Sequence, residues 1–241
     1  MGCPGTLRCY GRSNNNAMAV IAFSILAPYD SFHPHDTFVG GIDTSSITIV
    51  WVMSELVKNP RVLDKVQAEI RGCVGKKAKL DQDDLKNLKY LKMVVKETFR
   101  MHPPIVLLLP RETIRHCKIG GDNGYDIYPK TRILVNAWAI GRDPKSWENP
   151  DEFYPERFED NDIDFKGKHF QLVPFGAGRR ICPGLAMGVA TVEFTLANLL
   201  YWFDWELPNG MEREAMSMEE DGGGITVHKK TPLYLVPIKY I

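Results

Sequence analysis

The sequence has no excess of charge of either sign, because its 30 lysines and arginines balance its 30 aspartates and glutamates. A clustered excess of basic residues is the usual electrostatic footprint of a nucleic-acid-binding protein. The balanced charge therefore argues against nucleic acid as a partner. Cysteine is also scarce. Its five residues are scattered and form no Cys-x-x-Cys pair, which disfavours both a zinc cluster and a disulfide framework.

Long apolar runs are absent as well. No stretch approaches the roughly 20 apolar residues that a membrane-spanning helix needs. Residues 17–27 are mostly apolar, but this stretch is short, ends at Pro28 and lacks the charged flank of a signal peptide. We therefore expect that the chain itself carries no membrane anchor.

The sequence does contain enough apolar material for a core. Hydrophobic residues make up 44% of its 241 positions, which suits one large domain or two small ones. The first 35 residues are the exception, because Gly, Asn and Pro interrupt any periodic pattern there. We expect residues 1–35 to be an atypical, disordered segment with at most a weak helix over 17–27, and order to begin at Asp36.

A glycine-rich loop near the C-terminal end delivers one cysteine to the start of a helix. Its pattern is Phe175-x-x-Gly178-x-Arg180-x-Cys182-x-Gly184. The glycines let a flat ligand approach the backbone closely, and the arginine adds a cation beside the thiol. A thiolate with a neighbouring arginine suits an iron porphyrin that carries propionates. A cysteine considered in isolation is more often just a small buried side chain.

The helix behind this loop is predicted from apolar residues that recur at steps of three and four over 185–203. Pro183 suits the first helical position, where its missing N–H is no loss. The positive end of the helix dipole would then lie beside Cys182 and favour its thiolate.

A long helix is predicted over 38–58, and Asn59-Pro60 ends it. It contains the segment Gly40-Gly41-Ile42-Asp43-Thr44-Ser45. Each glycine costs a helix about 1 kcal/mol. The segment is therefore either a frayed helix start or a local opening, in which Thr44 hydrogen-bonds a ligand and Asp43 relays protons.

Another helix, predicted over 88–101, places Glu97 three residues before Arg100, close enough for an ion pair. Taken alone, such a pair is usually exposed and stabilises little. After this helix, Ile105–Leu109 is predicted to be a short extended run, and residues 131–136 are a strand candidate.

Two further strands are predicted in the last twenty residues of the sequence. Ile225–His228 and Leu233–Val236 are rich in β-branched and other apolar residues and follow a triple-glycine turn. They are expected to pair with each other.

These motifs together resemble the cytochrome P450 family and occur in the order typical of that family. The cysteine loop is similar to its haem-binding loop, and residues 40–45 to its oxygen-activating groove. Glu97 and Arg100 match its Glu-x-x-Arg signature. Arg157, in Pro155-Glu156-Arg157-Phe158, matches the arginine that completes a buried Glu-Arg-Arg network in the family.

The resemblance covers residue 36 to the end of the chain. The amino-acid sequences of segments 107–113 and 136–144 are similar to those of the plant microsomal (A-type) branch. The resemblance implies a mainly α fold with small β-sheets, namely the C-terminal half of the cytochrome P450 fold. Residues 36–241 would then be a partial haem domain. Complete members also have an N-terminal anchor, early helices and a first sheet. We therefore expect residues 1–35 to have an origin outside the family.

The resemblance also implies a function: a haem-thiolate monooxygenase of plant secondary metabolism. Such an enzyme inserts one oxygen atom from O2 into a small apolar substrate, and NADPH–cytochrome P450 reductase supplies the electrons. Cys182 would be the axial ligand of haem b, and Arg180 and Arg111 would neutralise its propionates. Asp43 and Thr44 would deliver protons. The resemblance to the microsomal branch also implies a location at the cytosolic face of the endoplasmic reticulum membrane.

Two alternatives remain open. One is a haem-thiolate isomerase or dehydratase that needs no reductase. Such enzymes tend to lose the groove threonine, so Thr44 argues against this reading. The other is a truncated, non-catalytic fragment that does not hold haem stably. A difference spectrum of the reduced protein with carbon monoxide would separate these possibilities.

Overall fold

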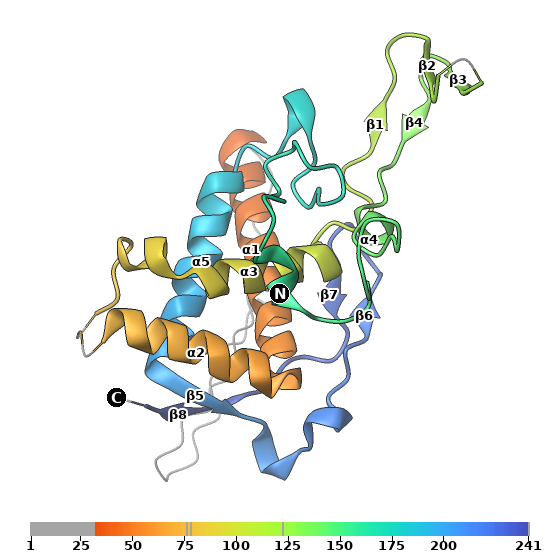
Figure 1. Ribbon diagram of the computed structural model, residues 1–241. Helices are drawn as coiled ribbons and strands as arrows, with labels where there is room; N and C mark the ends of the chain where they lie inside the picture. Colours follow the sequence, from red (N-terminus) through yellow and green to blue (C-terminus); the bar gives the residue numbers. More distant parts are fainter. Residues whose placement is uncertain (1–31, 76, 78, 122, 241) are drawn as a thin grey trace, which may run out of the picture.

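The computed structural model describes residues 32–240 apart from 76, 78 and 122. The weak helix predicted over 17–27, and the rest of the predicted disordered segment up to residue 31, lie outside this range. Four helices form the centre of the fold: α1 (Phe32–Lys58), α2 (Pro60–Val74), α3 (Lys89–Met101) and α5 (Leu185–Trp202). Figure 1 shows α1 and α5 running alongside each other while α2 and α3 cross them, and all four contact one another.

Helix α1 begins at Phe32, six residues earlier than its predicted start at 38 and inside the segment predicted to be irregular. Pro34 is the third residue of the helix. The first turn of a helix needs no backbone donor, so a proline is tolerated there. The end at Lys58 agrees with the prediction, because Pro60 starts α2.

The apolar faces of α2 and α3 pack into a single core. Val66 and Ile70 of α2 and Leu91 and Val95 of α3 are all fully buried. Between these helices lies the short 3₁₀ helix η1 (Asp84–Asn87). Burial of a large apolar side chain stabilises a fold by about 1.5–3 kcal/mol. Contact between these apolar helix faces therefore largely decides how the helices pack.

Helix α5 starts at Leu185 with Gly184 as its N-cap, so the placement of Pro183 at the first helical position was wrong. The N–H of Leu185 is hydrogen-bonded to the carbonyl of Cys182 at 3.4 Å, which leaves Pro183 in the turn before the helix. Within the described range, α5 alone is long and apolar enough to cross a membrane by length and composition. Core helices pass the same test, and Leu196 and Leu200 of α5 are buried in the core.

The strands are short and form two-stranded antiparallel sheets: β1 (Arg111–Glu112) with β4 (Arg132–Ile133), β2 (Cys117–Ile119) with β3 (Tyr125–Ile127), β5 (Phe203–Glu206) with β8 (Val236–Lys239), and β6 (Glu220–Asp221) with β7 (His228–Lys229). The remaining elements are the single-turn helix α4 (Ala137–Ile140) and the 3₁₀ helices η2 (Pro155–Phe158), η3 (Gly178–Arg180), η4 (Pro208–Gly210) and η5 (Arg213–Ala215). In Figure 1 the β2–β3 hairpin projects away from the helical body.

Two strand predictions were wrong. The segments 225–228 and 233–236 do not pair with each other, because β7 pairs with β6 and β8 pairs with β5. Ile105–Leu109 is not extended but forms bends and a turn, with Leu108 at φ 49°. Its carbonyls find partners in the segment before α4, since Val135 donates to Leu107. The predicted fold class, mainly α with small β-sheets, is confirmed.

Candidate functional site

The cysteine loop is closed by its own backbone. The N–H of Cys182 donates to the carbonyl of Phe175 at 2.9 Å, and the N–H of Gly176 donates to the carbonyl of Val173 at 3.0 Å. Gly176 and Gly178 have φ values of 72° and 73°. A side chain at either position would strain the backbone. Two of the loop glycines are therefore required by the turn that brings Cys182 to the start of α5.

An aromatic cluster holds this loop against α3. The ring of Phe175 meets that of Phe99 edge-on, with centroids 5.0 Å apart, and lies 5.5 Å from that of Phe165. Such pairs contribute about 0.5–1.5 kcal/mol beyond their burial. Sequence reasoning identified Phe175 but not its two partners. The apolar spacing of α3 was a usable signal for Phe99, whereas no pattern distinguished Phe165.

Two arginines distant in sequence meet beside the loop. Nη2 of Arg111, which starts β1, donates to the carbonyl of Arg180 at 3.4 Å. The same nitrogen lies 3.7 Å from the point where a Cβ on Gly176 would be. Among the described residues neither Arg111 nor Arg180 forms an ion pair. The Arg111 guanidinium thus contacts the backbone of a second arginine, and the absence of an acidic partner for either among the described residues suits an anionic ligand.

These residues fit haem b, the group that the resemblance implies. Cys182 is a free thiol at intermediate exposure. A Cβ on Gly178 would meet nothing within 4 Å, and one on Gly184 would meet only Sγ of Cys182, at 3.9 Å. The loop therefore offers a soft sulfur ligand, open space around it and two unpaired cations. That donor set matches a thiolate-ligated iron porphyrin with propionates.

The groove residues lie on an unbroken part of α1. The predicted local opening is not a break in the helix, because the helix continues through residues 40–45. The hydroxyl of Thr44 donates to the carbonyl of Gly40 at 2.6 Å. The carboxylate of Asp43 accepts a hydrogen bond from Thr226 at 2.8 Å and lies 3.5 Å from Nε2 of His228. Within the described range, neither groove residue has a hydrogen bond or ion pair to the cysteine loop.

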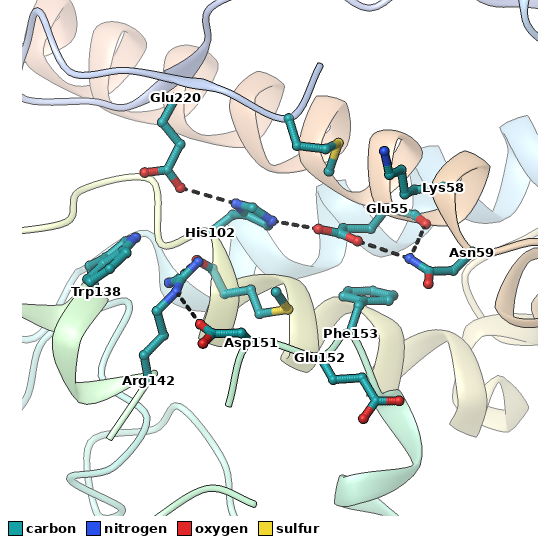
Figure 2. A pocket seen from close by; sticks show the side chains of 12 residues that line it. Glu55, Lys58, Asn59, His102, Trp138, Arg142, Asp151, Glu152, Phe153 and Glu220 are labelled. Carbon is teal, nitrogen blue, oxygen red and sulfur yellow. Dashed lines mark hydrogen bonds and ion pairs between the residues drawn. The ribbon is translucent and has the colours of Figure 1, made fainter. Parts of the chain in front are cut away.

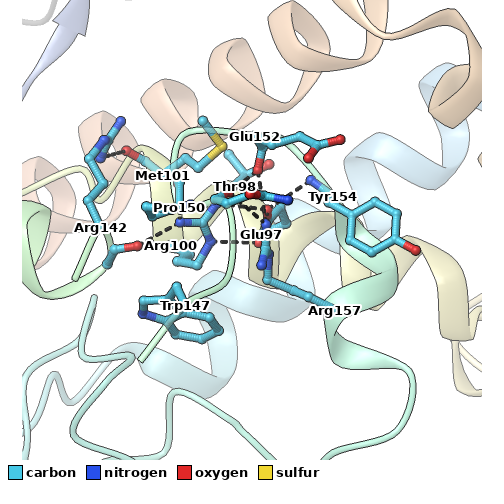
Figure 3. Close-up of polar contacts among 12 residues, drawn as sticks. Glu97, Thr98, Arg100, Met101, Arg142, Trp147, Pro150, Glu152, Tyr154 and Arg157 are labelled. Atoms are coloured by element: carbon cyan, nitrogen blue, oxygen red, sulfur yellow. Dashed lines mark hydrogen bonds and ion pairs between the residues drawn. The ribbon is translucent and has the colours of Figure 1, made fainter. Parts of the chain in front are cut away.

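Glu97 and Arg100 form a fully buried ion pair at the end of α3 (Figure 3). Nε and Nη2 of Arg100 each donate to a carboxylate oxygen of Glu97 at 2.8 Å. Nη1 of Arg100 donates to the carbonyls of Gly141 and Pro150, both at 2.6 Å. Because both side chains are 0% exposed, the alternative of a solvent-exposed pair is excluded.

Arg157 joins the same carboxylate from η2. Its Nε donates to Oε1 of Glu97 at 2.9 Å, and the N–H of Tyr154 donates to that oxygen at 2.9 Å. The guanidinium of Arg157 also donates to the carbonyls of Glu148, Asn149 and Glu152. Glu97 therefore ties α3 to the irregular segment 141–157, which precedes the cysteine loop.

Glu156, the neighbour of Arg157, belongs to a second cluster that sequence reasoning missed. Its carboxylate accepts hydrogen bonds from Arg61 and Lys65 of α2 and from the hydroxyl of Tyr90 of α3. Burial alone would raise the pKa of Glu156, but the hydrogen bonds from Arg61 and Lys65 outweigh it and lower the pKa to about 2. The motif containing Arg157 thus anchors the segment to both α2 and α3.

His102, directly after α3, was also missed. It lies in a cavity of about 610 Å³ between α1 and β6 (Figure 2). Nε2 lies 2.8 Å from Oε1 of Glu55, and Nδ1 lies 3.3 Å from Oε1 of Glu220. The ring stacks on Trp51 with centroids 4.0 Å apart. Burial alone would lower the pKa of His102, but the hydrogen bonds to Glu220 and Glu55 raise it.

Comparison with known proteins agrees with this geometry. A sequence model of the family described as "Cytochrome P450" matches residues 34–236. The chain is 56% identical over 207 residues to parthenolide synthase of Tanacetum parthenium, covering 86% of this chain and 40% of the relative. It is 60% identical over 206 residues to 4-hydroxyphenylacetaldehyde oxime monooxygenase of Sorghum bicolor, covering 85% and 38%.

A third relative aligns with more of the chain. Cytochrome P450 71B9 of Arabidopsis thaliana is 52% identical over 236 residues, covering 98% of this chain and 44% of the relative. The chain thus spans about two fifths of the length of these curated relatives. The cysteine loop, the buried Glu-Arg-Arg network and the family match lead to one conclusion: the chain belongs to the cytochrome P450 family and corresponds to the C-terminal portion of a plant A-type member.

Proposed function

We propose that this chain provides the haem-thiolate part of a monooxygenase that inserts one oxygen atom from O2 into a small apolar substrate of plant specialised metabolism. The observation that carries this proposal is the meeting of Arg111 and Arg180 beside the Cys182 loop, with no acidic partner for either among the described residues. The printed name of the sorghum relative, an oxime monooxygenase, supports the same reaction class.

Haem b would be held from this side by three groups. Cys182 would provide a sulfur ligand for the iron, and Arg111 and Arg180 would neutralise the propionates. Phe175, Gly178 and Gly184 would shape the loop around the ring. When bound through a thiolate, haem supplies oxygen activation, because the sulfur donates electron density that favours O–O cleavage.

The residues of α1 would manage protons. The carboxylate of Asp43 can hold a proton at Oδ1 or Oδ2, the oxygens that face His228 and Thr226. The hydroxyl of Thr44 donates to Gly40 in this structure. A modest rotation would free it to donate to a ligand. Delivery of a proton by a positioned side chain typically accelerates a reaction by 10²–10⁴-fold.

The network of Glu97, Arg100 and Arg157 would act on geometry. It fixes the segment before the cysteine loop without touching the loop itself. Buried ionic networks of this kind are costly to break. We assign the three residues a positioning role.

The remaining parts of the reaction are proposed from the family. NADPH–cytochrome P450 reductase would supply electrons at the cytosolic face of the endoplasmic reticulum membrane. Retention of Thr44 favours oxygenation over isomerisation or dehydration, which need no proton delivery to oxygen.

A carbon monoxide difference spectrum of the reduced protein tests the proposal. We expect the band of a thiolate-ligated haem, and its loss in Cys182→Ser. Cys73 and Cys117 are exposed thiols, so Cys73→Ser and Cys117→Ser are matched controls that should keep the band. An unchanged band in Cys182→Ser would refute the assignment of the ligand. A protein that never gives the band would instead be a non-catalytic fragment.

A further inference from the structure

The turn between β6 and β7 reaches the acidic residue of the proposed oxygen-activating groove. The hydroxyl of Thr226, in this turn, donates to Oδ2 of Asp43 at 2.8 Å. Nε2 of His228, the first residue of β7, lies 3.5 Å from Oδ1 of the same carboxylate. Oγ1 of Thr226 and Nε2 of His228 are themselves 3.4 Å apart. Three polar groups therefore meet at the side of α1, and both oxygens of Asp43 are engaged.

The position of this turn is fixed at its base. The ring N–H of Trp51 donates to the carbonyl of Val227 at 3.3 Å, and the N–H of Val227 donates to the carbonyl of Pro104 at 2.9 Å. Glu220, in β6, contacts His102, which also contacts Glu55 of α1 (Figure 2). The hairpin is thus attached to α1 at its strands as well as at its turn.

The side chains of His228 and Asp43 differ in their exposure to solvent. The side chain of His228 is 53% exposed and that of Asp43 is 39% exposed. An imidazole can take up and release protons near neutral pH. His228 is therefore the more exposed of the two groups, and the hydroxyl of Thr226 lies within 3.4 Å of its Nε2 and donates to Asp43.

We propose that Thr226 and His228 form the solvent end of the proton path that serves Asp43, an inference that rests on the proposed function. Protonated His228 donates its Nε2 proton to Oγ1 of Thr226, whose own hydroxyl proton passes to Oδ2 of Asp43. The transfer leaves a neutral imidazole and a carboxylic acid. His228 then regains a proton from bulk water, so the path is ready for the next turnover.

In this path His228 supplies the proton, and the hydroxyl of Thr226 relays it to Asp43. Valine at 226 removes the hydroxyl while keeping the shape of the side chain. Serine keeps the hydroxyl. Leucine at 228 removes the proton donor. Without timely protons, dioxygen that has received two electrons takes up two protons from solvent and leaves as hydrogen peroxide.

The test has two parts. The first is peroxide released per NADPH oxidised, measured with reductase in a completed enzyme, made by joining residues 36–241 to the N-terminal portion of the Arabidopsis relative. We expect Thr226→Val and His228→Leu to lower the rate of the proton-dependent step on the order of 10-fold, less than full loss of a general acid causes because solvent partly substitutes. The fraction of NADPH oxidation that ends as peroxide should therefore rise in both variants. Thr226→Ser keeps the hydroxyl and should show the low peroxide fraction of the unaltered enzyme.

His116→Leu is the matched control. His116 is 54% exposed and pairs with Asp126 at 3.0 Å on the β2–β3 hairpin. It therefore resembles His228 in exposure and pairing but lies on another hairpin. This variant should leave the peroxide fraction unchanged.

The second part reports the geometry without catalysis. In the 241-residue chain, thermal unfolding of Asp43→Ala, Thr226→Val and the double variant should show non-additive midpoint shifts, because each single change removes the same hydrogen bond between these two side chains. Additive shifts would overturn the contact. A normal carbon monoxide band with an unchanged peroxide fraction in both Thr226→Val and His228→Leu would overturn this inference alone. Absence of the band in the unaltered enzyme would overturn the proposed function and this inference with it.

Discussion

Replacement of Glu97 by glutamine is expected to destabilise the fold by about 3–5 kcal/mol, the cost of leaving a buried charge without its partner. Glu97 and Arg100 are both 0% exposed. Oε1 of Glu97 accepts three hydrogen bonds, from Arg100, Arg157 and the N–H of Tyr154, and Oε2 accepts one from Arg100. Glutamine has only one acceptor oxygen, so its NH2 group must face at least one of these donors.

The magnitude is large because a domain of this kind is stable by only about 5–15 kcal/mol. Urea unfolding, followed by tryptophan fluorescence, measures it directly. Trp147 is a suitable reporter, because the guanidinium of Arg100 lies 5.5 Å from its ring centroid. A milder variant, Arg157→Lys, keeps the charge but loses the fork of hydrogen bonds. It should remain folded and cost about 1–3 kcal/mol.

Glu156→Gln is the matched control. Its carboxylate also binds two cations, but Arg61 and Lys65 are 58% and 47% exposed. Because solvent screens exposed partners, Glu156→Gln should cost less than Glu97→Gln. If Glu97→Gln cost less than its control, or remained within about 1 kcal/mol of the unaltered protein, the claim that this network fixes the segment before the cysteine loop would be refuted.

Three further outcomes are expected. The stability of the fold should fall as pH drops from about 4.5 toward 2, because the folded-state pKa of Glu156 is about 2 and its ordinary value is 4.5; Glu156→Gln should flatten that dependence in urea unfolding, and an equal slope in both proteins would contradict it. Thr44→Ala in the completed enzyme should raise peroxide release per NADPH oxidised while leaving the carbon monoxide band intact, and unaffected coupling would show that the groove is misassigned. The 241-residue chain expressed by itself should bind less than one haem per molecule, because Phe38 of α1 and Met187 of α5 are 65% and 66% exposed and large exposed apolar surfaces favour association; a soluble, stoichiometrically loaded and well-coupled protein would defeat this expectation.

The main helices and the identity of the key side chains could be predicted from the amino-acid sequence. Apolar residues at steps of three and four marked α5 to within one residue, because a helical stripe must face the core. The predicted helix over 88–101 likewise matches α3 to within one residue. The spacing of Glu97 and Arg100 placed both on one helix face. The loop before α5 was recognisable because its glycines and its cysteine form a sparse but specific pattern.

The contacts between segments distant in sequence became visible only in the folded structure. Arg111 and Arg180 are 69 residues apart, and no local pattern indicates that their segments adjoin. The pairing of β5 with β8 and of β6 with β7 could not be read from strands this short, since two to four residues specify no register. Burial likewise distinguished Glu97–Arg100 from an ordinary surface pair. Helix formation depends on neighbours within a few residues, whereas burial and pairing depend on which distant segments the whole chain brings together.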